Sequence, residues 1–263
     1  MNVYQPIAWG VYLLYVTGPA GSGKSQLVGA LGNWYEEKGF TVARVNLDPG
    51  ALDLPYEPDV DCRELVNIYE LMEEKGLGPN GALIMAVSMV AINLAKLQAM
   101  LDEVNPDLAL IDTPGQLELF VFRESGPFIT SHLRHSGRLN LFLFDATLAK
   151  EASNLASLAF LAASTQLRLG LPQVGVLTKV DLAKEEVQRI LRWLEQPAAF
   201  EAALTEGRKD EYRRLLSRGV WRSVSRLGFS SFLYPVSSIT LEGFLNLSAV
   251  ISRILMRGEE MAE

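Results

Sequence analysis

Short runs of apolar residues alternate along this chain with longer segments in which apolar residues recur every three or four positions. The short runs predict strands at residues 11–16, 41–46, 108–111, 139–144, 174–177 and 231–234. The longer segments predict helices, the first over residues 24–38 and ended by Gly39 as its C-terminal cap. Strands that are apolar on both sides are typical of a parallel sheet covered by helices on both faces. The pattern therefore predicts a three-layer α/β fold.

One segment, residues 51–106, is longer than the connections of a minimal α/β unit and predicts a helical insertion. A first helix follows a capping-box spacing at Asp61 and Glu64 and ends near Gly76. A second helix covers residues 82–104 and is apolar nearly all round, so more than one of its faces must be covered. A three-layer monomer could cover it, but we favour a subunit interface.

A second long segment, residues 197–230, is predicted to be a helical insertion rich in arginine. Its arginines recur every four residues at Arg214, Arg218, Arg222 and Arg226. Solvated charge is the simpler interpretation of this stripe, and a docking face for an acidic protein partner is the alternative. Because no flexible linker divides the chain, residues 1–263 are expected to form one domain that carries both insertions.

Composition argues against several classes of protein and site. The chain has 31 acidic against 24 basic residues, and its net charge of −7 disfavours direct binding to nucleic acid or to an anionic membrane. A single cysteine, Cys62, excludes a disulfide framework and a cysteine-rich zinc site. His132 and His135 are spaced to share a helical face, but without a third ligand they are interpreted as structural residues.

The chain is expected to be cytoplasmic. Its first residues contain no Lys or Arg before the apolar run at 11–16, unlike a signal peptide. The longest apolar stretch, residues 82–95, is interrupted by Ser88 and Asn93 and is too short to span a bilayer.

The first predicted strand leads directly into a glycine-rich loop. The segment GPAGSGKS at residues 18–25 fits the pattern G-x-x-x-x-G-K-[ST] and opens the first predicted helix. In such a loop, backbone N–H groups surround an anion, the lysine reaches the β- and γ-phosphates, and the serine hydroxyl ligates Mg²⁺. The predicted phosphate-binding residues are Gly18, Ala20, Gly21, Ser22, Gly23, Lys24, Ser25 and, through its backbone, Gln26. The loop predicts nucleoside triphosphate binding and leaves kinases, ATPases and GTPases open.

A second motif bears on the base. Thr178, Lys179, Val180 and Asp181 follow the fifth predicted strand. The Asp181 carboxylate can accept hydrogen bonds from the ring N–H and the amine of guanine, whereas adenine offers no such donor pair on that edge. The Lys179 stem would lie over the base. Taken alone, the Asp would more simply cap the next helix, but its position in a phosphate-loop protein favours guanine. Ser237 could present its backbone N–H to the guanine oxygen.

Candidates for metal binding and water activation follow two other strands. Asp112 could hold Mg²⁺ through a water, and the Gly115 N–H could contact the γ-phosphate. A segment anchored in this way would relax when that phosphate leaves, so residues 113–128 are a candidate switch. Gln116 could orient the attacking water, or be an ordinary exposed glutamine. Asp48 could do the same, or form part of an Asp-Pro-Gly turn.

In order, the segments GPAGSGKS, NLDPG, GPNG, DTPGQ and TKVD resemble those of the GPN-loop GTPases, a family within the signal-recognition-particle and MinD-like class of P-loop proteins. The resemblance covers about residues 11–256 and is to archaeal-type homodimeric members. Its most specific element is Gly78-Pro79-Asn80, which on its own would be a plain turn between two helices. The resemblance implies the P-loop NTPase fold.

The resemblance also implies a mechanism. It implies Mg²⁺-dependent hydrolysis of GTP in a homodimer, where the Gly-Pro-Asn loop of one subunit reaches toward the γ-phosphate held by the other. Asn80 would then stabilise the charge that develops during hydrolysis, as Lys24 does from its own subunit. Asp48, Asp112 and Gln116 would surround the attacking water. The implied role is a molecular switch or assembly factor, and the alternative is a slow nucleotide-gated binding module. Phosphoryl transfer to a small molecule would need an acceptor pocket that the sequence does not indicate.

Overall fold

The computed structural model of this chain describes residues 10–205, 215, 219, 223 and 233–255. The predicted arginine stripe at Arg214, Arg218, Arg222 and Arg226 lies outside the described residues. The first two residues of the last predicted strand, 231–232, also lie outside them.

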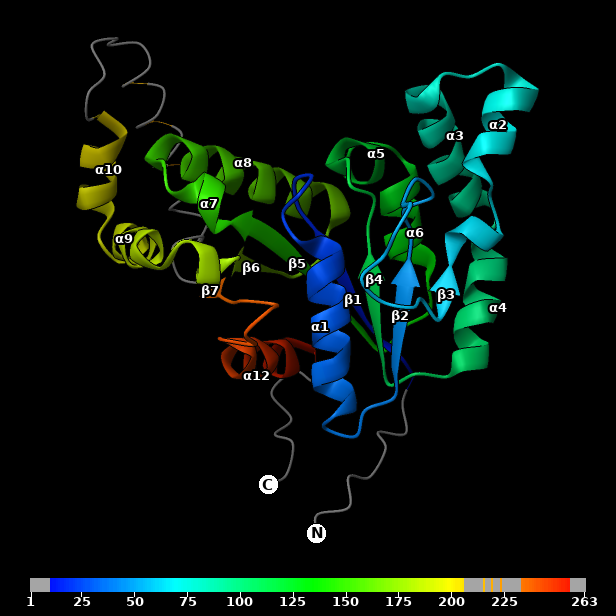
Figure 1. Ribbon diagram of the computed structural model, residues 1–263, viewed down its shortest axis with the longest axis horizontal. Coiled ribbons are helices and arrows are strands. Elements are labelled where there is room, and N and C mark those ends of the chain that lie inside the picture. The colour runs from blue at the N-terminus through cyan, green and yellow to red at the C-terminus, as the bar shows by residue number, and fades with distance from the viewer. Residues whose placement is uncertain (1–9, 206–214, 216–218, 220–222, 224–232, 256–263) are drawn as a thin grey trace.

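A seven-stranded sheet forms the centre of the fold (Figure 1). Its spatial order is β3-β2-β4-β1-β5-β6-β7, and all neighbouring strands are parallel. The strands are β1 (Tyr12–Thr17), β2 (Val42–Asn46), β3 (Val60–Asp61), β4 (Leu108–Asp112), β5 (Gly137–Asp145), β6 (Gln173–Thr178) and β7 (Leu233–Pro235). The six strands predicted from apolar runs are confirmed to within two residues wherever the structure describes them. Strand β3 was not predicted, because a two-residue edge strand is too short to form such a run.

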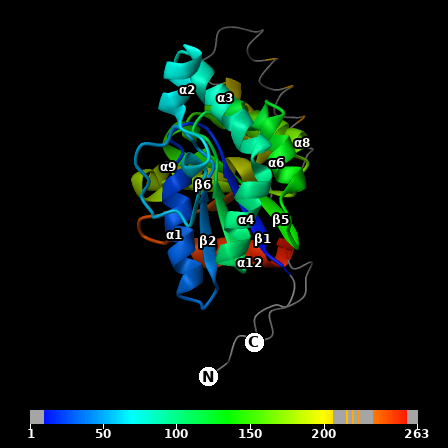
Figure 2. The same ribbon diagram turned by 90° about the vertical axis from the view of Figure 1, so that its right-hand side faces the viewer.

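Helices cover both faces of the sheet (Figure 2). Side chains along β1 alternate between two cores, with Leu14 in one and Leu13 in the other. The core of Leu14 lies under α1 (Lys24–Glu36) and α12 (Phe244–Leu255). The other core is covered by α2 (Ile68–Lys75), α3 (Pro79–Ile92), α4 (Leu94–Val104), α5 (Leu117–Val121), α6 (Ser125–His132), α7 (Ala146–Ala149), α8 (Ala152–Leu169), α9 (Lys184–Glu195) and α10 (Pro197–Thr205). The three-layer prediction is confirmed.

Three helix ends can be compared with their predicted positions. Helix α1 ends at Glu36, two residues early, and its C-cap is Glu37, so the prediction of Gly39 as the cap is wrong. Gly39 instead takes a left-handed conformation (φ 88°) in the turn that follows. The prediction that Asp61 caps the next helix is wrong. Asp61 instead begins a short 3₁₀ turn, and Asn67 caps α2 by accepting hydrogen bonds from two backbone N–H groups. Gly76, also left-handed, ends α2 as predicted.

The predicted helix over residues 82–104 is two helices, α3 and α4, bent by 65° at Asn93. The Asn93 side chain donates to the Met89 carbonyl oxygen (2.9 Å), a local bond that competes with regular helical bonding. Helix α3 leaves Met85 and Ile92 36% and 80% exposed, so the described chain leaves part of its apolar surface uncovered. Within the described residues, no single helix is long and apolar enough to cross a membrane. Only α3 and α4 taken together across their bend have the length and composition of a span.

The contact between α5 and α6 depends on a glycine. A Cβ at Gly126 would lie 1.9 Å from the Phe120 carbonyl oxygen, which only backbone movement could relieve. We therefore expect Gly126→Ala to lower the free energy of unfolding by about 1–3 kcal/mol, the usual cost of overpacking. Gly29→Ala in α1 is the control, because its Cβ would meet only ordinary contacts of 3.5 Å or more. Equal thermal midpoints for Gly126→Ala and the unmodified chain would contradict this packing argument.

Candidate functional site

The loops that follow β1, β2, β4 and β6 come to one edge of the sheet (Figure 1). This edge holds the carboxyl end of every strand, because all of the strands are parallel. Strand β1 lies at the centre between β4 and β5, where the direction of the chain order switches. Open parallel sheets bind ligands beside such a point. The predicted site residues thus reach one edge from separate parts of the chain.

The glycine-rich loop joins β1 to α1, as predicted. Gly21 and Gly23 have φ values of 73° and 93°, which residues with a Cβ rarely adopt. Gly23 is the N-cap of α1, and no side chain caps the first N–H groups of that helix. An uncapped helix N-terminus preceded by a tightly curved backbone is suited to bind an anion.

Lys24 is buried inside this loop. Its Nζ donates to the carbonyl oxygens of Gly18 (3.1 Å) and Pro19 (3.0 Å). Burial lowers the pKa of Lys24, while the charges of Asp112 and Asp48 act in the opposite direction. Because a buried ammonium group is costly unless negative charge compensates it, the phosphates of a nucleotide would stabilise this arrangement.

Asp112 ends β4 and is 2% exposed. Its Oδ2 accepts a hydrogen bond from the Tyr56 hydroxyl (3.0 Å), and its Oδ1 is buried with no hydrogen-bond partner among the described residues. Burial raises the pKa of Asp112 to about 6, against the lowering effect of the Ser25 and Tyr56 hydroxyls. Mg²⁺ prefers oxygen ligands, taking one or two from side chains and others from substrate phosphates. The Asp112 carboxylate thus lies within reach of the Ser25 hydroxyl and keeps one unpartnered oxygen, which fits the predicted metal-binding pair, Ser25 and Asp112.

Asp48 joins two loops of the site. Its Oδ1 accepts from the Gly50 N–H and its Oδ2 from the Gly115 N–H, both at 2.9 Å. The buried Asn46 side chain holds Asp48 from behind, accepting from its N–H (3.0 Å) and donating to its carbonyl oxygen (3.2 Å). Asp48 thus forms the Asp-Pro-Gly turn with one oxygen and contacts the loop after β4 with the other. The Gly115 N–H, predicted to contact the γ-phosphate, is bonded here to a carboxylate.

Gln116 and Asn80 are both exposed. Gln116 precedes α5 directly after Gly115, so the structure brings it to the edge of the site. Asn80 lies in the first turn of α3, in the α2–α3 turn that projects at the outer end of the insertion (Figure 1). Among the described residues, no hydrogen bond joins Asn80 to the phosphate loop of its own chain.

The base motif is attached to the phosphate loop. The Thr178 hydroxyl donates to the Ser22 carbonyl oxygen (2.8 Å), and the Lys179 Nζ donates to the Gly21 carbonyl oxygen (2.7 Å). These bonds bring the segment after β6 against the loop after β1, although the two lie far apart in sequence. The structure therefore brings the predicted base-binding and phosphate-binding segments together.

Asp181 follows in the turn after β6 and is half-buried. The interpretation of Asp181 as a helix cap is wrong, because the N-cap of α9 is Ala183. No side chain of a described residue donates a hydrogen bond to the Asp181 carboxylate. This leaves its acceptor capacity for a ligand.

Ser237 differs from its predicted role. Its backbone N–H donates to the Glu242 carbonyl oxygen (3.1 Å). Its hydroxyl oxygen accepts from the N–H groups of Ile239 (3.2 Å) and Thr240 (3.1 Å). Ser237 therefore organises its own loop, and its N–H is not available to a guanine oxygen in this structure. Sequence patterns could not show this bond, because it depends on how the loop turns back.

Two residues at the site were not identified from the sequence. Tyr56, in the loop between β2 and β3, holds one oxygen of Asp112. Asp145, at the end of β5, accepts a hydrogen bond from the Lys179 Nζ (2.6 Å). The position of Asp145 directly after an apolar run was a usable signal. No pattern around Tyr56 connects it with β4.

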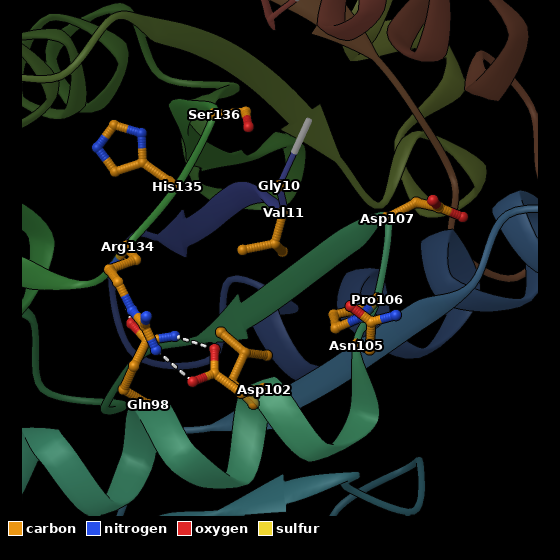
Figure 3. Close-up of a pocket in the computed structure, with 11 residues that line it drawn as sticks. Gly10, Val11, Gln98, Asp102, Asn105, Pro106, Asp107, Arg134, His135 and Ser136 are labelled. Atoms are coloured by element: carbon orange, nitrogen blue, oxygen red, sulfur yellow. Dashed lines mark hydrogen bonds and ion pairs between the residues drawn. The ribbon is translucent and has the colours of Figure 1, made fainter. Parts of the chain in front are cut away.

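A cavity of about 520 Å³ lies near the opposite, amino-terminal edge of the sheet (Figure 3). It is lined by residues that precede strands, including Gly10 before β1, Asp107 before β4 and Ser136 before β5. Arg134, also in its lining, forms an ion pair with Asp102 of α4, so its charge is compensated. The cavity therefore lies apart from the phosphate loop and is not the nucleotide site.

The two histidines do not share a helical face, contrary to the prediction. Helix α6 ends at His132, whose ring stacks on Phe128 with 4.1 Å between ring centroids. His135 lies beyond the helix, in the lining of the cavity. The helix ends here because Leu133 adopts an extended conformation.

The chain matches known proteins over most of its length. A model of a family described as "Conserved hypothetical ATP binding protein" matches residues 16–257. GPN-loop GTPase PAB0955 of Pyrococcus abyssi is 39% identical over 176 residues, which cover 66% of this chain and 69% of that protein. GPN-loop GTPase 3 of Eremothecium gossypii is 31% identical over 249 residues, which cover 93% and 92%.

Among solved structures, the fold matches the crystal structure of PAB0955 from Pyrococcus abyssi, a GTPase in apo form. The TM-score is 0.80 and the sequence identity 32%, over 93% of this chain and 97% of that one. The predicted P-loop NTPase fold is confirmed. The chain belongs to the GPN-loop GTPase family.

Proposed function

We propose that this chain hydrolyses GTP to GDP and phosphate by direct attack of water on the γ-phosphate. The observation that carries the proposal is the grouping of the buried Lys24 with Asp112 and Asp48 at the carboxyl edge of the sheet. Together they supply a cation for the phosphates and carboxylates for the metal and the water. The names of the relatives support the same activity.

The choice of base rests on Asp181. The family description names ATP, whereas the relatives are named as GTPases. We favour guanine because the half-buried Asp181 has acceptor capacity for the two donors on the guanine edge. Adenine has no donor pair there and would leave a partly desolvated carboxylate unpaired.

The substitution Asp181→Asn tests this choice. Replacing an acceptor by an amide donor is expected to weaken GTP binding by about 10- to 100-fold, the value of hydrogen bonds to a charged group. Xanthosine triphosphate, which presents an oxygen where guanine has its amine, should bind the variant better than GTP. Fluorescence titration with labelled nucleotides measures both affinities, with Asp53→Asn at an exposed position as the control. An unchanged preference for GTP would remove Asp181 from base recognition.

Asp48 is the residue that we propose to position the attacking water, with Gln116 beside it. When a γ-phosphate takes the Gly115 N–H, the Asp48 oxygen bonded there is released and becomes free to accept from water. Because Gly115 lies within residues 113–128, the same exchange would make the contacts of this segment depend on whether a γ-phosphate is bound. This contact supports a role as a molecular switch or assembly factor.

A slow nucleotide-gated binding module would use the same contact. In that case the exchange between Asp48 and the γ-phosphate would control partner binding, and hydrolysis would only reset it. Turnover under saturating GTP, compared with the lifetime of a captured partner, distinguishes the two roles.

Ser25 and Asp112 are the residues that we propose to hold Mg²⁺. When bound, the ion would offset negative charge on the β- and γ-phosphates. Asp112 can present its bare Oδ1 because the Tyr56 hydroxyl holds Oδ2. The proposed metal ligands thus come from the start of α1 and the end of β4.

Removal of Mg²⁺ with EDTA is expected to abolish turnover and to speed the release of bound fluorescent GDP.

Asp112→Asn removes the ligand charge with little change of shape. It should raise the Mg²⁺ concentration needed for half-maximal slowing of release by about tenfold or more. Release rates measured across a Mg²⁺ titration test this, with Asp107→Asn as a carboxylate control at the opposite edge. Identical titrations for Asp112→Asn and the unmodified chain would contradict the metal assignment.

We further propose that the active site is completed across a homodimer. Helix α3 begins in the Gly-Pro-Asn turn and leaves Met85 and, at its far end, Ile92 exposed, and a second copy could cover these side chains. In such a dimer Asn80, which makes no hydrogen bond to its own phosphate loop among the described residues, would reach the site of the partner. There its amide could donate to the charge that develops on the γ-phosphate.

Mixing two inactive variants tests the shared site. Asn80→Ala is expected to lower turnover by roughly 100-fold with little loss of GTP affinity, because it removes a donor used in the transition state. Asp48→Ala should also be inactive. In a random mixture about one quarter of the sites would carry both intact residues, and activity should return to that level. A mixture no more active than its components would contradict a site built by two subunits.

A further inference from the structure

Lys179 has an unusual backbone conformation, and its side chain makes two hydrogen bonds. Its φ of 60° is in the left-handed region, which a non-glycine residue rarely adopts and which persists only where the surroundings impose it. Its Nζ donates to the Asp145 Oδ2 (2.6 Å) as well as to the Gly21 carbonyl oxygen (2.7 Å). The lysine thus spans the space between the end of β5 and the phosphate loop.

Asp145 is placed to hold this lysine. It ends β5, pairs in register with Thr178 of β6, and has a side chain only 6% exposed. Its two oxygens have separate partners. Oδ1 accepts from the N–H (2.8 Å) and hydroxyl (2.6 Å) of Thr147 and so caps α7, while Oδ2 faces Lys179 alone. Burial would raise the pKa of Asp145, but the bonds from Lys179 and Thr147 hold it below its usual value.

The surroundings of Asp145 also join the two halves of the nucleotide site. The neighbouring Thr178 hydroxyl is bonded to the Ser22 carbonyl oxygen (2.8 Å), and Lys179 to the adjacent Gly21. Among the side chains of Asp145, Thr178 and Lys179, only that of Asp145 is negatively charged. It is also more buried than Lys179, its partner in the ion pair. Its charge therefore fixes where the lysine stem lies, and with it the turn that carries Asp181.

We infer that Asp145 is a positioning residue for base recognition: it holds Lys179 in the left-handed turn that presents the lysine stem and the Asp181 carboxylate to the base. Asp145 itself touches no nucleotide, since its oxygens are occupied by Thr147 and Lys179. The inference rests on the proposed recognition of guanine by Asp181.

The substitution Asp145→Asn separates the two functions of this side chain. The amide keeps an oxygen to cap α7 and loses the charge that holds Lys179. GTP and GDP affinities should fall together by about tenfold, as expected for a charged hydrogen bond that is partly open to solvent. Turnover at saturating GTP should stay within about twofold of the unmodified chain, because the phosphate contacts remain. The preference for GTP over ITP, which lacks the exocyclic amine, should shrink.

Two further variants guard against a purely structural effect. Thr147→Val removes the hydroxyl partner of Oδ1 and leaves Lys179 untouched, so it should lower the thermal midpoint slightly and leave the GTP-to-ITP ratio unchanged. Asp145→Ser keeps a good helix cap but cannot reach the lysine. It replaces Asp145→Asn if that variant does not fold, with the same expected loss.

A double-mutant cycle tests whether Asp145 affects GTP binding through Lys179 or independently of it. Lys179→Met keeps the apolar stem and removes the ammonium group, so Asp145→Asn added to it should weaken GTP binding no further. Additive losses, or GTP binding by Asp145→Asn with unchanged affinity and unchanged GTP-to-ITP ratio, would overturn the inference. If the unmodified chain itself prefers ATP, the proposed guanine recognition fails instead, and the two failures are distinguishable.

Discussion

The ammonium group of Lys24 is the buried charge on which the arrangement of the carboxyl edge depends. Its hydrogen bonds to Gly18 and Pro19 compensate part of its desolvation, but carbonyl dipoles carry no net charge. The acidic groups whose fields act on it are Asp112 and Asp48. The positive charge of Lys24 thus favours both a bound triphosphate and two nearby carboxylates. These carboxylates are suited to ligate a metal ion and to accept a hydrogen bond from water.

The fold was predictable because its strands are apolar on both sides, so that the parallel sheet is evident without any knowledge of contacts. The errors lie where tertiary contacts choose between equivalent local signals. Asp61 and Asn67 are both good helix caps, and Asp61 is used elsewhere because Asn46 and Arg63 bind its carboxylate. Asn93 gave little warning of a bend within an otherwise apolar helix. In each case the side chain was known and its partner was not.

The same division applies to the site. Residues whose proposed role follows from a local motif, such as Lys24 and Asp181, could be selected from the sequence because the spacing of the motif itself indicates the chemistry. Tyr56 acts through a residue 56 positions away, and Asp145 through one 34 positions away. Ser237 was assigned a donor that its own loop consumes. Supporting residues of this kind become visible only when the sheet places the ends of its strands side by side.

The bond between Asp48 and Gly115 would, in the proposed mechanism, allow nucleotide binding and hydrolysis to be controlled separately. With the N–H of Gly115 held by a carboxylate, the segment after β4 already has the conformation of an anion-bound loop, and a γ-phosphate replaces one anion by another. The exchange costs little, because one charge-assisted bond is lost for each one gained. In the proposed exchange, the Asp48 oxygen would leave its bond to the Gly115 N–H and become free to accept a hydrogen bond from water. In the proposed dimer, that freedom would lead to hydrolysis only where Asn80 of a second copy is present, so one chain would suffice for binding and two would be needed for reaction.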